Sequence, residues 1–355
     1  MKLGLYLGYW GIGPQGEQAV ELVQEAERVG FDSVWVAESY GSDVVSILAW
    51  LVPQTSTIKL GGAIMQVPAR PPAAAAMAGA TIDTLSGGRF IFGFGPSGPQ
   101  VSEGWYGVPY AKPWGRTREY IEIVRRIIAR EGPLEYHGKH FTLPLPADAP
   151  GATGQGKALK LNFHPLRNEI PVFVGAIGRK SVELAAEICD GWIPVFFSVE
   201  KFEEVWGEHL EAGFAKGGRS REQLEVSPSV QVAIDGDLEA ARAVVRAGLV
   251  LYLGGMGSRK TNFYVDLTHR FGFGEVADEV QRLFLDGKRE EAFNAIPDEL
   301  VDATSLIGSE EEVARRLEAF TAAGVDRIIC TPAHVDHEQR LHTVRRLAAL
   351  VGTGG

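Results

Sequence analysis

The chain has 355 residues, of which 45% are hydrophobic and 23% charged, as in ordinary globular proteins. Its net charge of −10 argues against a nucleic-acid partner or an anionic membrane surface. The two cysteines, Cys189 and Cys330, lie in apolar surroundings, which argues against a disulfide framework. Because no apolar run reaches the ~18 residues of a membrane span, and the N-terminus has no signal-peptide pattern, the sequence predicts a cytoplasmic protein.

Short apolar runs alternate with helical periodicity along nearly the whole chain. Eight runs are typical of strands: 3–9, 33–38, 58–66, 89–95, 170–178, 190–197, 224–234 and 326–332. Helices are predicted at 17–30, 44–55, 71–88, 117–132, 179–189, 198–218, 237–255, 309–324 and 338–352. Strict alternation implies parallel strands with right-handed crossovers, and eight units in a chain of this length favour a closed (β/α)8 TIM barrel.

Two stretches interrupt the alternation. Residues 133–169 contain a predicted hairpin and a loop rich in proline and glycine, and residues 254–305 precede the last helix–strand pair. We interpret both as insertions at the carboxyl-terminal rim of a single domain that covers residues 1–355. The second insertion is the better candidate for a lid, because it combines aromatic residues with Arg259 and Lys260.

A glycine-rich segment, GFGPSG at 93–98, follows the fourth predicted strand and has the spacing of a dinucleotide-binding fingerprint. That fingerprint needs free backbone N–H groups at the start of a helix. Pro96 and Pro99 remove two such donors, and we expect no helix before about Arg116. The segment is therefore interpreted as a loop at the carboxyl end of a barrel strand, where barrel enzymes carry out their chemistry.

A better candidate anion site follows the fifth predicted strand. The segment Gly175-Ala176-Ile177-Gly178 leads into a helix that begins near Arg179 and Lys180. Free N–H groups at a helix start and two adjacent cations favour a phosphate. The same sequence is about equally consistent with an ordinary turn between strand and helix whose basic side chains face solvent.

For acid–base chemistry the candidates are Glu38, at the end of the second strand, and Glu103, after the fourth. Surface carboxylates would give the same pattern. Four aromatic residues follow strands and could line a pocket for a flat ring or fill the top of the barrel: Trp10, Trp105, Tyr106 and Trp114. No group of metal-binding side chains has the spacing of a metal site, so no metal is expected.

Three segments together, FDSVWVAESYGSD (31–43), IDTLSGGRFIFGFGPSGPQVSEGWYG (82–107) and VFVGAIGRKSVELAAEICDGWIPVFF (172–197), resemble the luciferase-like monooxygenase superfamily. They are most similar to its branch of oxidoreductases that use the deazaflavin coenzyme F420, which includes methylenetetrahydromethanopterin reductases. The similarity runs from Lys2 to about Val335. It implies a TIM barrel with the cofactor at the carboxyl ends of the strands, and a homodimer.

The resemblance also implies positions for the cofactor. Its tricyclic ring would lie against a bulge after the third strand, which carries a non-proline cis peptide in this family and maps to Gly62, Ala63 and Ile64. Its phosphate would contact the anion site, and Arg179, Lys180, Arg259 and Lys260 would meet its acidic tail. The cofactor-binding residues expected in this way are Ser39, Gly62, Ala63, Ile64, Gly95, Gly175, Ala176, Ile177, Gly178, Arg179 and Lys180.

The implied reaction is hydride transfer between C5 of the deazaflavin and a small organic substrate, with Glu103 as proton donor or substrate anchor. Relatives that oxidise sugar phosphates carry His and Trp where this chain has Ser39 and Asp43, which argues against such a substrate. Relatives that reduce methylenetetrahydromethanopterin carry Asp where this chain has the segment 96–100. Because a deazaflavin reacts poorly with oxygen, a reductase or dehydrogenase is favoured over an oxygenase.

Three other functions compete with this hypothesis. An FMN-dependent luciferase-like monooxygenase would share the fold and the phosphate site. A non-catalytic flavin- or deazaflavin-binding protein would need the same pocket but no proton donor. A metal-dependent barrel hydrolase is disfavoured because the ligand cluster is missing.

Overall fold

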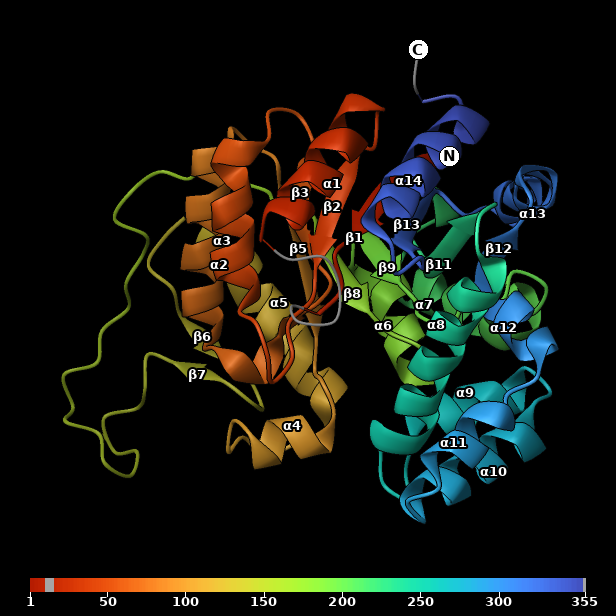
Figure 1. Cartoon of the computed structure of the whole chain (residues 1–355). Helices are drawn as coiled ribbons and strands as arrows, with labels where there is room; N and C mark the ends of the chain where they lie inside the picture. The colour runs from red at the N-terminus through yellow and green to blue at the C-terminus, as the bar shows by residue number, and fades with distance from the viewer. Residues whose placement is uncertain (10–15, 354–355) are drawn as a thin grey trace.

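The computed structural model describes residues 1–9 and 16–353, which form an α/β fold around a parallel sheet (Figure 1). The strands of the sheet are β1 (Lys2–Tyr6), β2 (Ser33–Val36), β3 (Lys59–Gly62), β4 (Met65–Gln66), β5 (Phe90–Gly95), β8 (Val172–Gly175), β9 (Gly191–Ile193), β10 (Glu225–Val226), β11 (Ser229–Ile234), β12 (Ser305–Gly308) and β13 (Arg327–Pro332). Their order is β10-β9-β8-β5-β3-β2-β1-β13-β11-β12, with β4 beside β5. The predicted α/β architecture with parallel strands is confirmed.

The two ends of this order meet in the run predicted at 224–234. β10 pairs with β9, and β11, which follows it after Ser227 and Pro228, pairs with β13. The N–H group of Ser229 donates to Pro194 beyond β9, and further along β11 the same edge pairs with β12. One stretch of chain therefore connects both ends of the sheet. The residues after β9 contact only the start of β11, and β12 pairs with the remainder of β11.

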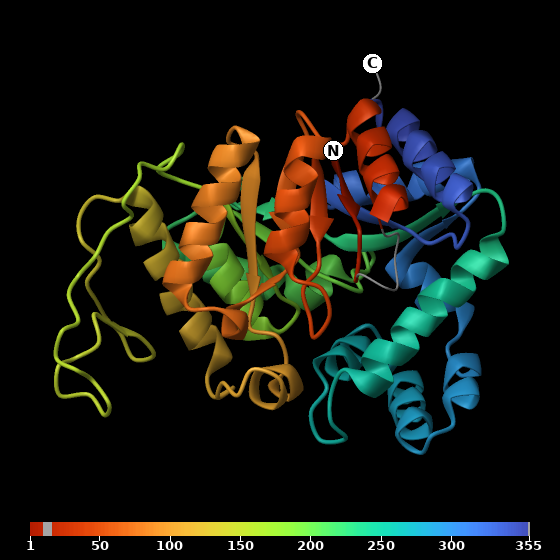
Figure 2. The ribbon, with the colours of Figure 1, turned by 60° about the vertical axis from the view of Figure 1, so that its left-hand side comes forward.

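Helices cover the outside of the sheet (Figures 1 and 2). They are α1 (Gly16–Arg28), α2 (Val44–Leu51), α3 (Pro72–Ser86), α5 (Pro113–Ala129), α6 (Arg179–Ile188), α7 (Glu208–Gly217), α8 (Leu238–Val250), α13 (Glu310–Ala322) and α14 (His337–Val351). Side-chain oxygens cap several of their first turns: Asp43 accepts from Ser46, and Ser309 forms a capping box with Glu312. None of the described helices has the length and hydropathy needed to span a bilayer.

Large apolar side chains from five different strands meet on the inner face of the curved sheet. They are Trp35, Ile91, Phe173, Ile193 and Ile329, all 4% exposed or less. The indole of Trp35 fits because its neighbours are glycines: a Cβ on Gly61 would lie 2.4 Å from the ring, and one on Gly4 2.8 Å from Nε1. The interior of the curved sheet is therefore filled by side chains, and in such folds ligands bind at the carboxyl ends of the strands.

A buried arginine closes the amino-terminal end. Arg327, 1% exposed, donates Nε to Glu225 at 2.7 Å and pairs through Nη1 with Asp32 at 2.6 Å. Burial alone would raise the pKa of Glu225, but Arg327 and Lys2 outweigh it and hold the pKa at about 2. This carboxylate must therefore stabilise the fold in its charged form.

We expect Glu225→Gln to lower the free energy of unfolding by up to about 3 kcal/mol at neutral pH, because the pKa of Glu225 is lowered from 4.5 to about 2 on folding. A lowered pKa stabilises the fold above the unfolded value of 4.5, and this contribution disappears as the pH falls towards 2. Urea unfolding of both proteins between pH 7 and pH 3 measures the difference. If the difference in free energy of unfolding between the two proteins stays constant across this pH range, Glu225 does not stabilise the fold through its charged form.

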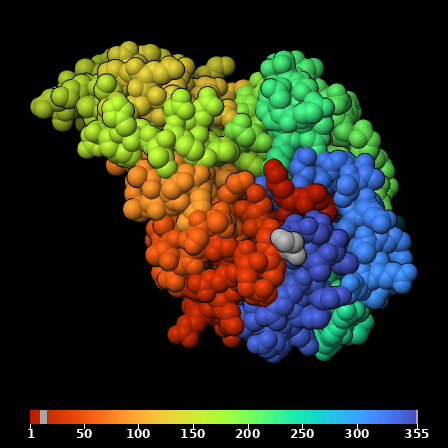
Figure 3. All heavy atoms as spheres, turned by 90° about the horizontal axis from the view of Figure 1, so that it is seen from above, coloured from red at the N-terminus to blue at the C-terminus, as the bar shows by residue number. Residues whose placement is uncertain are grey.

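The first insertion has the predicted hairpin, β6 (Tyr136–His137) and β7 (Thr142–Leu143), which pair antiparallel. The loop that follows stands away from the body of the molecule in Figures 2 and 3. It returns along α3, where Arg167 pairs with the buried Asp83. Figure 3 also shows the first and last segments of the chain side by side on one face, as the pairing of β1 with β13 requires.

One sequence expectation was wrong. The segment 96–116 is not free of helix: α4 (Pro99–Gly104) begins directly after Gly98, with Pro99 at a first helical position, where a missing N–H group costs nothing. The segment 254–305, for which no elements were named from the sequence, contains α9 (Phe263–Arg270), α10 (Gly274–Leu285), α11 (Arg289–Asn294), α12 (Asp298–Thr304) and the first residue of β12. These short helices pack against α8 and form their own apolar cluster.

Candidate functional site

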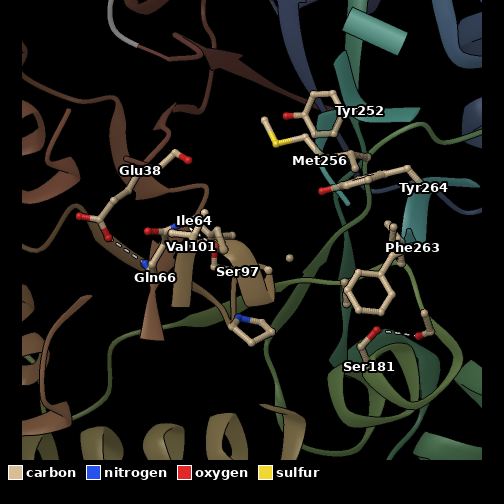
Figure 4. A pocket seen from close by; sticks show the side chains of 18 of the residues that line it. Glu38, Ile64, Gln66, Ser97, Val101, Ser181, Tyr252, Met256, Phe263 and Tyr264 are labelled. Atoms are coloured by element: carbon tan, nitrogen blue, oxygen red, sulfur yellow. Dashed lines mark hydrogen bonds between the residues drawn. The ribbon is translucent and has the colours of Figure 1, made fainter. Parts of the chain in front are cut away.

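A cavity of about 780 Å³ lies at the carboxyl ends of the strands, where the sequence predicted the site. One side is formed by residues that follow β2, β3 and β5, and the other includes residues between 252 and 264 (Figure 4). Its charged lining residues are Glu38, Arg179 and Lys180. This volume falls within the usual range of cofactor and substrate sites, roughly 300–1,000 Å³.

The bulge predicted after the third strand is present. The peptide bond Ala63–Ile64 is cis, and both residues line the cavity. The side chain of Ile64 lies between two glycines: a Cβ on Gly95 would be 2.0 Å from Cδ1 of Ile64, and one on Gly175 2.7 Å from Cγ2. The Tyr6 hydroxyl donates to the Ala63 carbonyl at 3.2 Å and so ties the bulge to β1.

This packing explains the glycine-rich segment that resembles a dinucleotide fingerprint. A Cβ on Gly93 would lie 1.8 Å from the carbonyl oxygen of Gly62, and a Cβ on Gly95 would overlap Ile64. The glycines of β5 are therefore needed because the bulge of the neighbouring strand approaches them closely. Gly62 and Gly95, expected to bind the cofactor, support the bulge and do not line the cavity.

Glu38 lines the cavity, but its buried carboxylate is fully engaged by a half-buried arginine. Arg70 donates to both carboxylate oxygens at 2.5 and 3.0 Å, and the Gln66 backbone N–H donates at 2.8 Å (Figure 4). Arg70 also contacts Asp43 at 2.8 Å. The Glu38 side chain is 3% exposed and that of Arg70 16%. The pair fastens the segment after the bulge to the end of β2, which is a structural role.

Beside this pair, the Gln66 side chain has one polar atom without a partner. Gln66 is 4% exposed; its Nε2 donates to the Ser97 hydroxyl at 2.8 Å, and its Oε1 has no partner among the described residues. If the amide is flipped, the Nε2 group is the unpaired one. A buried polar atom without a partner in a cavity wall marks a position for a polar ligand atom.

The loop after β8 has the geometry of an anion site. The carbonyl groups of its middle residues point into the protein: the indole of Trp192 donates to Ala176 at 2.8 Å, and that of Trp206 to Ile177 at 3.0 Å. The backbone N–H groups of Ile177, Gly178, Arg179 and Lys180 have no acceptor among the described residues. They precede or begin α6, and Gly178 is its N-cap, so the loop offers donors to an anion.

The charges near this loop also favour an anion. Arg270 of α9 donates to the Ile177 carbonyl at 2.9 Å, and burial and the neighbouring Arg179 lower its pKa. Arg270 and Arg179 therefore make the electrostatic potential near the loop more positive. Arg259 and Lys260, expected to contribute here, do not line the cavity: Arg259 is exposed and 3.4 Å from Asp286. Sequence reasoning missed Arg270, which lies 93 residues from Ile177 along the chain.

The remaining predicted site residues divide into two groups. Ser39, Trp105 and Trp114 line the cavity, as do all the predicted residues of the anion loop, namely Gly175, Ala176, Ile177, Gly178, Arg179 and Lys180. Glu103 and Tyr106 do not: Glu103 is exposed on α4 and accepts the Tyr110 backbone N–H at 3.1 Å. Trp10 lies outside the described residues. The geometry gives Glu103 no route to a bound substrate.

Three tyrosines that the sequence did not single out form the wall across the cavity from Ile64, and we call Tyr9, Tyr252 and Tyr264 the tyrosine wall (Figure 4 labels the last two). The hydroxyls of Tyr9 and Tyr252 are 3.2 Å apart. Phe196 contacts the rings of Tyr252 and Tyr264 edge-on, with centroids 5.0 and 5.7 Å apart. Burial raises the pKa of all three tyrosines, so they are neutral phenols at physiological pH.

No group of three or more metal-binding side chains occurs within the described ranges 1–9 and 16–353. The two cysteines are buried, and burial raises the pKa of Cys189 to about 12. The polar groups of the cavity thus include backbone donors, tyrosine and serine hydroxyls, one unpaired amide, two cations and the paired carboxylate of Glu38.

Comparison with known proteins identifies the family. The model of the luciferase-like monooxygenase family matches residues 8–327. The chain belongs to this family. It is 49% identical, over 99% of both chains, to a Mycobacterium tuberculosis protein whose name proposes a coenzyme F420-dependent oxidoreductase. It is 30% identical to the 5,10-methylenetetrahydromethanopterin reductase of Archaeoglobus fulgidus, over 91% of this chain and 92% of the reductase.

Solved structures of this family share the fold. The coenzyme F420-dependent tetrahydromethanopterin reductase of Methanopyrus kandleri superposes with a TM-score of 0.80 at 24% identity, covering 98% of this chain and 97% of the reductase. An F420-dependent secondary alcohol dehydrogenase, solved with an F420–acetone adduct, gives 0.77 at 18% identity over 100% and 99% of the two chains. The resemblance found in the sequence motifs is confirmed.

Proposed function

We propose that this protein is an oxidoreductase that uses coenzyme F420 to transfer a hydride to or from a small organic substrate. The observation that carries the proposal is the combination of the bulge at Ala63–Ile64 with the anion loop across one cavity. The relative with 49% identity over the full length carries the same cofactor in its name, which supports the choice of cofactor.

The residues of the cavity fit this cofactor. The N–H groups of 177–180 and the cations Arg179 and Lys180 would hold its phosphate and the acidic groups beyond it. Ile64, fixed between Gly95 and Gly175, would support one face of the ring. The unpaired amide of Gln66 lies at the same wall and can bond a polar ring atom. When bound, the deazaflavin supplies hydride chemistry.

The chain itself contributes binding, orientation and exclusion of water. Trp192, Trp206 and Arg270 hold the anion loop from behind, so its donors need no rearrangement to receive the phosphate. On the other side, apolar and aromatic side chains surround the space left for a substrate. Proton donation by Glu103, which the sequence suggested, has no support in the geometry, and the Glu38 carboxylate is paired with Arg70.

Titration of the purified apo-protein with coenzyme F420 and with FMN tests the cofactor. We expect saturable binding of the deazaflavin and weaker binding of FMN. The fluorescence of each cofactor measures its binding. Tight FMN binding without deazaflavin binding would favour the alternative, an FMN-dependent monooxygenase, which NADH- and oxygen-dependent turnover would reveal. Deazaflavin binding without any turnover across a substrate panel would favour a non-catalytic binding protein.

Replacing the cations of the anion loop should weaken cofactor binding. We expect the variant Arg179→Ala, Lys180→Ala to raise the Kd for coenzyme F420 by about thirtyfold at low salt, since each of the two charged contacts contributes about 1 kcal/mol. The difference should shrink at high salt because these side chains are exposed. Equal affinities of variant and wild type at low salt would contradict the phosphate site.

The remaining expectations are also proposals. The chain would be one (β/α)8 domain over residues 1–355, with residues 133–169 and 254–305 inserted at its rim, and it would act in the cytoplasm, where its two cysteines remain reduced. It would form a homodimer. The uncharged exposed side chains of Trp50, Met77 and Leu85 on the adjacent helices α2 and α3 support an interface between copies.

A further inference from the structure

The tyrosine wall has hydrogen-bonding capacity that the protein does not use. Tyr9 and Tyr252 share one hydrogen bond between two hydroxyl groups, so one of the two protons has no acceptor within the described part of the chain. The Tyr264 hydroxyl has no hydrogen-bond partner among the described residues. Two phenolic protons therefore remain available at one wall of the cavity, and phenols in such surroundings normally have a partner.

We propose that the hydroxyl groups of Tyr252, Tyr264 and Tyr9 bind the oxygen atom of an uncharged carbonyl substrate, or of the corresponding alcohol in the reverse direction. The proposal rests on the proposed hydride-transfer function and names its substrate class and the residues that select it. Figure 4 shows Tyr252 and Tyr264 across the cavity from Ile64, so a ligand between the two walls has the bulge on one side and the tyrosines on the other.

The distribution of charge excludes an anionic group at this wall. The charged residues that line the cavity are Glu38, paired with Arg70, and Arg179 and Lys180 at the anion loop. Figure 4 shows the uncharged side chains of Met256 and Phe263 beside the tyrosine wall, and Phe196 packs against two of its rings. A carboxylate or phosphate placed there would lose its hydration without a cation to replace it, whereas a carbonyl oxygen needs only the two hydrogen bonds.

The orientation of the hydroxyl groups is fixed before a substrate binds. Tyr252 and Tyr264 contact each other edge-on with centroids 4.7 Å apart, and Phe196 packs against both rings. Asn262 holds this segment: its side-chain Nδ2 donates to the carbonyl groups of Tyr252 and Leu253, and its Oδ1 caps α9 by accepting from Tyr264. Packed rings with fixed hydroxyls discriminate between substrates better than mobile ones.

The step balances with the reduced deazaflavin as the reductant. A hydride is transferred to the carbonyl carbon, where a C–H bond forms while the C=O π bond breaks. The electron pair of that bond moves to the oxygen, which takes a proton passed from solvent along the tyrosine hydroxyls. The carbonyl compound gains two electrons and two hydrogens. Oxidation of the reduced cofactor by two electrons accounts for the hydride and releases one proton to solvent, which replaces the one taken up by the oxygen. Neutral phenols suit this role because they remain hydrogen-bond donors across the physiological pH range.

The test compares matched neutral and anionic carbonyl compounds: benzaldehyde with carboxybenzaldehyde, and cyclohexanone with oxocyclohexanecarboxylate. Oxidation of reduced coenzyme F420 by the wild-type protein gives kcat/KM for each. We expect the neutral member of each pair to be preferred at least tenfold. A preference for the carboxylates, or no oxidation by any carbonyl compound while the cofactor binds, overturns the proposal.

Tyr252→Phe and Tyr264→Phe remove the hydroxyl groups and keep the rings. Each should lower kcat/KM for the neutral substrate about tenfold, and the double variant about a hundredfold, because one hydrogen bond to the reacting oxygen is worth about 1.4 kcal/mol. The Kd for coenzyme F420 should change less than about twofold. Tyr136→Phe is the matched control, because the Tyr136 hydroxyl bonds Glu122 away from the cavity. Wild-type kcat/KM in the double variant refutes the tyrosine role, whereas failure of the wild type to bind coenzyme F420 refutes the proposed function itself.

Discussion

Replacing Arg70 by methionine is expected to lower the free energy of unfolding by about 4 kcal/mol and to weaken coenzyme F420 binding at least tenfold. The variant leaves the carboxylate of Glu38 buried without its cation, and an uncompensated buried charge typically costs about 3–5 kcal/mol. The carboxylate also accepts the backbone N–H of Gln66, which follows the bulge at Ala63–Ile64. Loss of the ion pair therefore loosens the wall that would support the cofactor.

Two further variants separate the ion pair from a general loss of packing. In the double variant Glu38→Gln, Arg70→Met no buried charge remains, so most of the stability should return while cofactor binding stays weak. Arg282→Met removes an exposed arginine paired with Glu279 and should change the stability by less than about 1 kcal/mol. Urea unfolding and deazaflavin titration provide both measurements. If Arg70→Met is no more destabilising than Arg282→Met, the buried pair does not hold the wall.

The α/β architecture was predictable because the periodicity of hydrophobic residues within short segments specifies helices and strands. Apolar runs and amphipathic stretches specify β/α units, and the order of the units then follows from the handedness of the crossovers. The four-residue β12 was missed because such a short strand has no recognisable period, and it forms only where the edge of β11 is left free by β9. The short helices of the second insertion were missed for a similar reason, since Gly272, Gly274 and Pro297 interrupt their pattern.

The site was predictable where its residues are contiguous. The anion loop at 175–180 and the bulge at 62–64 could be located because each is a short segment next to a strand end. The tyrosine wall could not, because Tyr9 and Tyr252 are 243 residues apart and meet only in the folded chain. The positions of carboxylates in the sequence were equally uninformative. Glu38 and Glu103 both follow predicted strands, but the fold buries Glu38 against Arg70 and leaves Glu103 in solvent.

Gly93→Ala is expected to raise the Kd for coenzyme F420 by about a hundredfold and to lower the free energy of unfolding by about 3 kcal/mol. The added Cβ would lie 1.8 Å from the Gly62 carbonyl oxygen, a contact that the backbone of the bulge can relieve only by moving. Such a movement changes the position of Ile64, whose side chain faces the cavity. Thermal unfolding and fluorescence titration with the deazaflavin measure the two effects.

Other glycine-to-alanine variants provide the scale for this effect. Gly132→Ala lies in open space with no atom within 4 Å of the new Cβ, and it should leave both stability and binding unchanged. Gly95→Ala should be intermediate, because its Cβ meets the end of the Ile64 side chain, which can rotate, rather than a backbone carbonyl. The order Gly93, Gly95, Gly132 in lost affinity would establish that the glycine-rich segment at 93–98 serves the bulge. Equal losses for Gly93→Ala and Gly132→Ala would instead mean that the segment has no part in shaping the cavity.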